Sequence, residues 1–144
     1  MSFILLAEDD DMLRETLKII LEGENFRVRG AKSCDEAAGI LLRHRPSLIV
    51  MDYWLGTELA DDLIKIAKED FNDPVPILLC SGWDGIHKIA NKNGIDHVVI
   101  KPFSIEEMVM AIANAMPVTS VFSSNTNVEA FFNSLQSIRN RHSP

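Results

Sequence analysis

The sequence predicts an α/β fold: a doubly wound, five-stranded parallel sheet with helices on both faces, followed by one extra helix at the C-terminus. Two observations support this. Five short apolar runs alternate with five amphipathic helical patterns over residues 1–116, and such alternation is typical of a parallel sheet covered on both faces. A sixth helical pattern, over residues 128–139, lies outside this alternation.

The apolar runs are too short for typical helices and suit buried strands. They occupy residues 3–7, 26–28, 48–51, 77–80 and 98–100. The third and fourth runs are apolar almost throughout, as in parallel strands that are covered on both faces. We therefore expect these two strands to be central in the sheet.

The helical patterns are stripes of apolar residues spaced three and four apart. In chain order they consist of Leu13, Leu17, Ile20 and Leu21; Ala37, Ala38, Leu41 and Leu42; Leu59, Leu63, Ile66 and Ala67; Ile86, Ile89 and Ala90; and Ile105, Met108, Val109, Ile112, Ala113 and Met116. Ser33 and Ser104 each precede a glutamate by three positions, a capping-box arrangement that marks a helix start. Gly23 and Gly94 stand at helix ends, where glycine is favoured.

The chain length and right-handed crossovers favour the flavodoxin-like strand order 2-1-3-4-5. In that order the first and third strands are neighbours, and ligands bind beyond their carboxyl ends. We expect this domain to span residues 1–116. The uncharged polar segment after Pro117 predicts a linker over 117–127, and residues 128–144 then form an amphipathic helix and tail.

The composition excludes several classes of protein. The net charge is −7 and no basic cluster is present, so direct binding of nucleic acid is not expected. No apolar run approaches the roughly 20 residues of a membrane-spanning helix, and the N-terminus does not resemble a signal peptide. The two cysteines form no metal or redox motif. These features fit a reducing cytoplasm.

Acidic residues cluster where the first and third strands end. Glu8, Asp9, Asp10 and Asp11 are consecutive, and Asp52 directly follows the third apolar run. One of Asp10 and Asp11 is explained as the cap of the following helix, but a cap does not account for all four acids. Since the two strands are neighbours, three carboxylates converge, and like charges in one site need a cation. Oxygen ligands without histidine or cysteine favour Mg2+.

A hydroxyl and an ammonium group are expected at the same edge. Ser81 ends the fourth strand and Lys101 the fifth. Taken singly, each is better explained as a turn serine or a surface lysine. Beside three acids at neighbouring strand ends, the set suits a phosphoryl group, whose charge the metal and the lysine offset and whose oxygens accept from the hydroxyl.

The segments ILLAEDDD, LIVMD, LLCSG and VVIKPF resemble the four signature segments of response-regulator receiver domains. The resemblance covers roughly residues 3–116. Each motif alone is weak, but four in the correct order at the ends of strands are specific. The resemblance implies a two-component signalling domain, a phosphoacceptor with at most slow self-dephosphorylation rather than an enzyme. Its partner would be a sensor histidine kinase or a histidine phosphotransfer protein.

The resemblance also assigns roles to single residues. The phosphoacceptor would be Asp52, and Lys101 and Ser81 would contact the phosphoryl group. The metal ligands would be Glu8, Asp9, Asp52 and the backbone carbonyl of Trp54. Glu8 and Asp9 match the acidic pair of the family, and Asp10 is a less favoured candidate for that pair. The family usually has a cis peptide bond between the lysine and Pro102.

The sequence departs from the family at two places. Gly56 stands where receivers commonly have proline, and Leu59-Ala60 stand where they have Asp-Gly. We therefore expect a different loop after the third strand. Val98 replaces the tyrosine or phenylalanine that usually acts as the rotating switch residue, which argues against the usual aromatic signalling mechanism but not against phosphorylation.

Three other functions fit parts of the pattern. Asp9 and Asp11 have the spacing of haloacid-dehalogenase-type phosphohydrolases, but Met12-Leu13 follow where threonine or valine is expected soon after. A flavodoxin-type flavin carrier needs a phosphate loop rich in small residues, and four acids there would repel phosphate. A receiver-like interaction module that is never phosphorylated is disfavoured by the intact Asp52, Ser81 and Lys101, but the altered loop and Val98 leave this alternative open.

A testable prediction concerns the C-terminal helix. Its apolar face of Phe131, Phe132, Leu135 and Ile138 must be covered, either by its own domain or in a homodimer. We expect a chain that ends at Met116 to lose thermal stability in the first case and to become a monomer in the second. Sedimentation and melting of both chains distinguish the two cases. The prediction fails if truncation changes neither.

Overall fold

The computed structural model describes residues 2–116, and the predicted linker and C-terminal helix lie outside the described residues. A five-stranded sheet with the order β2-β1-β3-β6-β7 forms the centre of this part of the chain. All four strand pairs are parallel. The strands are β1 (Ile4–Ala7), β2 (Val28–Ala31), β3 (Leu48–Asp52), β6 (Ile77–Ser81) and β7 (His97–Ile100). Counted along the chain, this is the predicted order 2-1-3-4-5.

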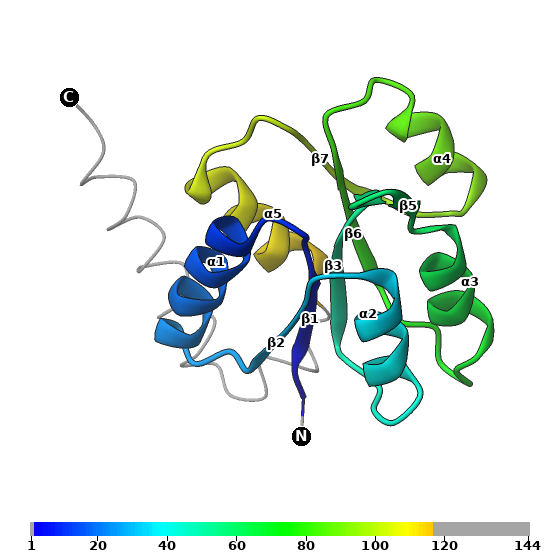
Figure 1. The fold of residues 1–144 in the computed structure, drawn as a ribbon, viewed down its shortest axis with the longest axis horizontal. Coiled ribbons are helices and arrows are strands. Elements are labelled where there is room, and N and C mark those ends of the chain that lie inside the picture. Colours follow the sequence, from blue (N-terminus) through cyan, green and yellow to red (C-terminus); the bar gives the residue numbers. More distant parts are fainter. Residues whose placement is uncertain (1, 117–144) are drawn as a thin grey trace.

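Five helices cover the two faces of the sheet, as predicted. They are α1 (Asp11–Gly23), α2 (Cys34–Leu41), α3 (Asp61–Glu69), α4 (Ile86–Lys92) and α5 (Ile105–Ala115). Helices α1 and α5 lie on one face, and α2, α3 and α4 lie on the other (Figure 1). The sheet is thus the middle of three layers, so each central strand is buried on both sides.

The side chains of the strands alternate between two apolar clusters. Leu5 and Ile49 point toward α2, α3 and α4, whereas Leu6 and Val50 point toward α1 and α5. All four side chains are almost completely buried. Because every second residue of a strand points to the same face, a strand between two layers needs apolar residues at consecutive positions. This explains the continuous apolar runs in the sequence.

Two of the helix starts follow the sequence closely. The hydroxyl of Ser33 accepts a hydrogen bond from Glu36 N at 3.2 Å, and that of Ser104 accepts from Glu107 N at 3.0 Å. Each bond satisfies a backbone N–H group that has no partner within the first helical turn. Ser33 and Ser104 therefore cap the starts of α2 and α5, as predicted.

Three details of the sequence prediction were wrong. Strand β2 begins at Val28 rather than Phe26, because only residues 28–31 pair with β1. Leu42 follows the last residue of α2 and its side chain is 82% exposed, whereas the preceding Leu41 is buried. Leu59 is not part of α3 but belongs to a short strand. In each case an apolar residue continues the sequence pattern past the boundary of the strand or helix: Phe26 and Leu59 lie before the start of the element, and Leu42 lies after its end.

The loop after β3 forms an antiparallel hairpin that the sequence did not predict. Strands β4 (Trp54–Leu55) and β5 (Glu58–Leu59) pair with Trp54 opposite Leu59. The connection is Gly56-Thr57, and Gly56 has a φ of +65°. Glycine at the first position of a two-residue connection is typical of a type II′ hairpin. The hairpin therefore explains why glycine stands where receivers commonly have proline.

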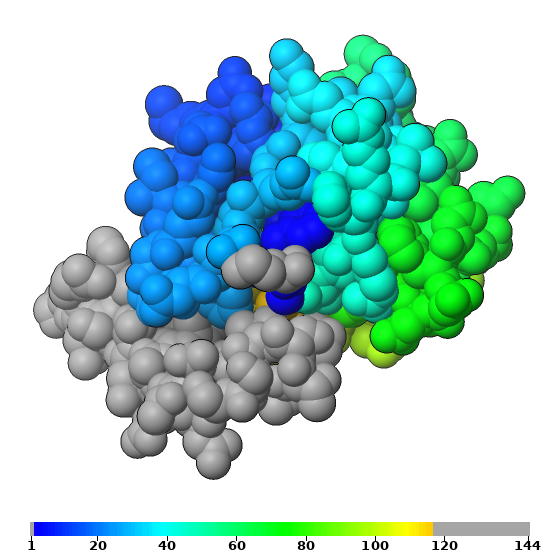
Figure 2. All heavy atoms as spheres, turned by 90° about the horizontal axis from the view of Figure 1, so that it is seen from below, coloured from blue at the N-terminus to red at the C-terminus, as the bar shows by residue number. Residues whose placement is uncertain are grey.

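The strands begin at the lower edge of the molecule in Figure 1 and end at the upper edge. Figure 2 views the lower edge, where the start of β1 in dark blue lies between the lighter blue and cyan segments of the chain. Within residues 2–116, no helix has the length and apolar character required to span a membrane. The carboxyl ends of the strands, which the sequence indicates as the ligand-binding edge, lie at the opposite side.

The neighbours Leu41 and Leu42 provide a test of this packing. We expect Leu41→Ala to lower the free energy of unfolding by about 2–5 kcal/mol, because it removes a buried side chain from the core. Leu42→Ala should change it by less than about 0.5 kcal/mol, because that side chain is exposed. Urea denaturation of both variants checks the prediction. Equal losses would contradict the observed end of α2.

Candidate functional site

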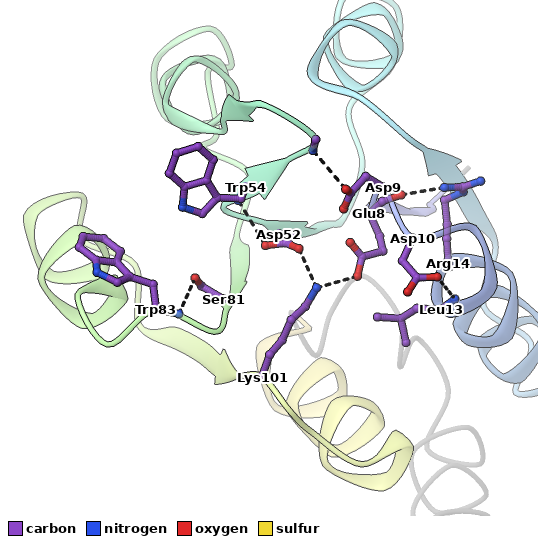
Figure 3. A network of polar contacts seen from close by, with 11 residues as sticks. Glu8, Asp9, Asp10, Leu13, Arg14, Asp52, Trp54, Ser81, Trp83 and Lys101 are labelled. Atoms are coloured by element: carbon purple, nitrogen blue, oxygen red, sulfur yellow. Dashed lines mark hydrogen bonds and ion pairs between the residues drawn. The ribbon is translucent and has the colours of Figure 1, made fainter.

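A network of polar side chains lies at the carboxyl ends of the strands (Figure 3). Glu8 and Asp9 follow β1, and Asp52 is the last residue of β3. Ser81 is the last residue of β6, and Lys101 directly follows β7. Four strands therefore contribute one or two side chains each, and the parallel arrangement brings all of them to the same edge.

The three acids form a compact group. One carboxylate oxygen from each of Glu8, Asp9 and Asp52 lies within 4.8 Å of the others. Asp10 is not in this group, because its carboxylate caps α1 by accepting from Leu13 N at 3.1 Å. Asp11 lies in the first turn of α1 and pairs with Arg14. The structure thus separates the four consecutive acids into two pairs with different partners.

Lys101 bridges two of the acids. Its Nζ lies 2.6 Å from Asp52 Oδ2 and 2.9 Å from Glu8 Oε1. The side chain of Glu8 is 5% exposed and that of Asp52 11% exposed, so water screens these contacts weakly. The ammonium group therefore offsets part of the repulsion between the two carboxylates.

These surroundings shift two pKa values. Burial raises the pKa of Glu8 to about 7, and the charge of Asp52 adds to the rise, although Lys101 opposes it. Burial acts to lower the pKa of Lys101, but its hydrogen bonds to Asp52 and Glu8 outweigh burial and raise that pKa above its usual value. Lys101 is therefore a permanent cation, and Glu8 changes its charge near neutral pH.

The acid group fits a hard divalent cation. Glu8 Oε2 is buried and has no hydrogen-bond partner among the described residues, and an unpartnered buried oxygen of this kind is costly unless a ligand satisfies it. The donors are all carboxylate oxygens, which suit Mg2+. The acidic cluster of Glu8, Asp9 and Asp52 is thus consistent with a magnesium site.

Backbone groups of the β4–β5 hairpin also reach the site. Trp54 N donates to Asp52 Oδ1 at 3.2 Å, and Gly56 N donates to Asp9 Oδ2 at 3.2 Å. The contact of Gly56 is not predictable from the order of residues, because no local pattern places the tip of this loop beside Asp9. A glycine between two short β-pairing segments was the only available signal.

Ser81 lies on the other side of Asp52. Its side chain is buried, and its hydroxyl accepts a hydrogen bond from Trp83 N at 3.1 Å. The indoles of Trp54 and Trp83 are both about half exposed and lie on this side of the site, away from Lys101 (Figure 3). The peptide bond between Lys101 and Pro102 is cis, as the resemblance implies.

The chain belongs to the response-regulator receiver domain family, whose profile matches residues 4–113. Among curated relatives, the heme response regulator HssR of Staphylococcus saprophyticus is 30% identical over 112 residues, 78% of this chain and 50% of the relative. The transcriptional regulatory protein SrrA of Staphylococcus aureus is 28% identical over 113 residues, 76% of this chain and 45% of the relative. The chain thus spans about half the length of these relatives.

Solved structures support the same assignment. The non-phosphorylated HemR receiver domain of Leptospira biflexa has a TM-score of 0.70 and 28% identity, and the match covers 80% of this chain and 94% of that one. The chemotaxis response regulator CheY4 of Vibrio cholerae also has a TM-score of 0.70, at 19% identity over 81% of this chain and 99% of that one. At that identity the second match shows the fold alone.

The buried Glu8 gives a prediction about pH. A carboxyl group whose folded pKa is raised from 4.5 to about 7 contributes stability below pH 4.5 and loses it as the pH rises through 7. In the presence of a chelator, the unfolding free energy of wild type should therefore fall relative to that of Glu8→Gln by on the order of 1–3 kcal/mol between these pH values. Urea denaturation at several pH values measures this.

The matched control is Glu15→Gln, which replaces an exposed carboxylate on α1. We expect its difference from wild type to stay nearly constant over the same pH range. A constant difference for Glu8→Gln as well would show that burial does not govern the ionisation of Glu8.

Proposed function

We propose that this receiver domain accepts a phosphoryl group on Asp52 from a phosphorylated histidine of a partner protein, in a reaction that depends on Mg2+. The observation that carries the proposal is the position of Asp52. It lies between a buried acid, a lysine ammonium group 2.6 Å away and the serine at the end of the next strand. A phosphoryl group on this carboxylate requires a positive charge to offset its own charge and donors for its oxygens, and Lys101 and Ser81 can supply them.

Asp52 acts as the nucleophile. A bond forms between its carboxylate oxygen and phosphorus, while the bond from phosphorus to the imidazole nitrogen breaks and its electron pair stays on that nitrogen. Lys101 is released from its ion pair with Asp52 and pairs with the oxygens of the phosphoryl group. The hydroxyl of Ser81 donates to another of these oxygens. The contribution of the protein is therefore mainly positioning and electrostatics.

The metal ligands we propose are Glu8, Asp9, Asp52 and the backbone carbonyl of Trp54. When bound, Mg2+ supplies positive charge that offsets the charge of the phosphoryl oxygens. Asp10 is not proposed, because its carboxylate is engaged as the cap of α1. Ionised Glu8 favours binding, so metal affinity should increase as the pH rises through the pKa of Glu8.

The partner we propose is a sensor histidine kinase or a histidine phosphotransfer protein, and the place of action is the cytoplasm. Phosphorylation would then change a surface that binds a further protein, as in two-state signalling domains generally. The net charge of −7 gives no support to direct binding of nucleic acid by this chain.

The variant Asp52→Asn tests the acceptor. It keeps the shape of the side chain but is a much poorer nucleophile, so we expect labelling with acetyl phosphate and Mg2+ to fall at least about 100-fold. Acid-labile radiolabel and intact mass measure the product. Asp70→Asn, an exposed acid at the end of α3, is the control and should label normally.

Two outcomes would overturn the proposal. Labelling of Asp52→Asn at the wild-type level would place the phosphoryl group elsewhere. A wild-type protein that is folded, binds Mg2+ and takes no label from acetyl phosphate or a phosphorylated histidine protein would instead be a receiver-like interaction module.

A further inference from the structure

The loop between β6 and α4 holds the indole of Trp83 against the backbone of Gly85. A Cβ built on Gly85 would lie 2.1 Å, 2.3 Å and 2.5 Å from three carbons of the indole. Such distances are far inside van der Waals contact, so the ring occupies the space that any other side chain at position 85 requires. Gly85 is thus the residue that allows this placement of Trp83.

Tyr53 provides the second contact of the indole. The two rings are nearly parallel, with an interplanar angle of 15° and a centroid separation of 6.5 Å, which is an offset stacked arrangement. Tyr53 is itself fixed, because its hydroxyl donates to Asp61 Oδ1 at 2.9 Å and its backbone N donates to Cys80 O at 2.9 Å. The indole therefore rests on a rigid residue that directly follows Asp52.

The backbone of Trp83 makes the connection to the reaction. Its N–H group donates to Ser81 Oγ at 3.1 Å, and its carbonyl accepts from Ile86 N at 3.1 Å at the start of α4. A hydroxyl that accepts a bond from a fixed donor has its oxygen held in one place and keeps its own proton for another acceptor. The backbone of Trp83 thus sets where the Ser81 hydroxyl stands (Figure 3).

We propose that Trp83 is a positioning residue for phosphoryl transfer: its indole, packed against Tyr53 and Gly85, fixes the loop whose N–H orients the hydroxyl of Ser81 toward Asp52. The proposal rests on the proposed function of Asp52. It explains why a large apolar ring that is 50% exposed has two well-defined contacts. It also explains why position 85 requires glycine, although Gly85 has no positive φ.

Two of the proposed metal ligands, Glu8 and Asp9, lie on the other side of Asp52, so positioning by Trp83 can be separated from metal binding. Glu8 and Asp9 follow β1, whereas Ser81 is the last residue of β6 and Trp83 follows it, and β3 lies between these strands. A loosened β6–α4 loop should slow transfer and leave the affinity for Mg2+ unchanged. General destabilisation of the domain would change both.

The test is a double-mutant cycle with Gly85→Ala and Trp83→Ala. The initial rate of Asp52 labelling by acetyl phosphate is measured with saturating Mg2+, and the affinity for Mg2+ is measured by calorimetry. Gly85→Ala should slow labelling about fivefold, the effect of one misplaced hydrogen bond, with unchanged Mg2+ affinity. In the Trp83→Ala background the same change should have no further effect, because the indole with which the Cβ collides is gone.

Two further variants complete the design. Gly39→Ala is the matched control, because a Cβ there meets nothing within 4 Å, and it should label at the wild-type rate.

Amide hydrogen exchange of Trp83 N–H provides a readout without phosphorylation: protection should fall in both Gly85→Ala and Ser81→Ala. The double variant guards against misfolding of Gly85→Ala, since it relieves the collision.

Each outcome decides the inference. Wild-type labelling by Gly85→Ala, effects of the two changes that multiply, or full protection of the Trp83 amide in Gly85→Ala would each overturn it. Failure of the wild type to take any label would refute the proposed function instead. The amide exchange experiment would then still decide whether the indole holds the hydrogen bond to Ser81.

Discussion

The ion pair from Lys101 to Glu8 and Asp52 is the interaction on which the site depends. Two carboxylates with little exposure repel each other when they lie close together, and the parallel sheet leaves them little freedom to separate because each lies at the carboxyl end of a central strand. The single ammonium group offsets this repulsion, but it does not satisfy every oxygen: Glu8 Oε2 is buried without a hydrogen-bond partner among the described residues. The acidic cluster is thus consistent with a site for an additional cation. Burial is the main cause of the raised pKa of Glu8, and the charge of Asp52 adds to it.

The two sides of Asp52 have different chemistry. On one side, Glu8 and Asp9 supply carboxylates, and the hairpin holds Asp9 through Gly56 N. On the other side, Ser81 supplies a hydroxyl whose oxygen is held by the backbone of Trp83. Asp52 therefore lies between a side rich in carboxylate oxygens and a side that offers a neutral hydroxyl group.

The departures from the family concern the loops rather than the sheet. Gly56 allows a tight hairpin where other receivers commonly have proline, and the hairpin presents Leu59 to solvent. Val98 is partly buried and packs against the core on the face of α2, α3 and α4, so no aromatic ring occupies that position. Aromatic residues near the site include Tyr53 and the two tryptophans, which belong to the segments after β3 and β6, and Phe103, which lines a small pocket with Glu8, Asp52 and Lys101.

The sequence by itself determined the class of fold and the order of strands, because buried parallel strands require continuous apolar runs and capped helices require particular residues at their starts. It also placed acids, a hydroxyl and an ammonium group at strand ends, because these residues directly follow the apolar runs in the chain. Only the tertiary structure decided that Glu8 and Asp9 join Asp52 while Asp10 caps α1, because that choice depends on where each side chain points after the strand ends. The hairpin contact to Asp9 and the packing of Trp83 on Gly85 likewise join residues through space, and no local pattern encodes such contacts.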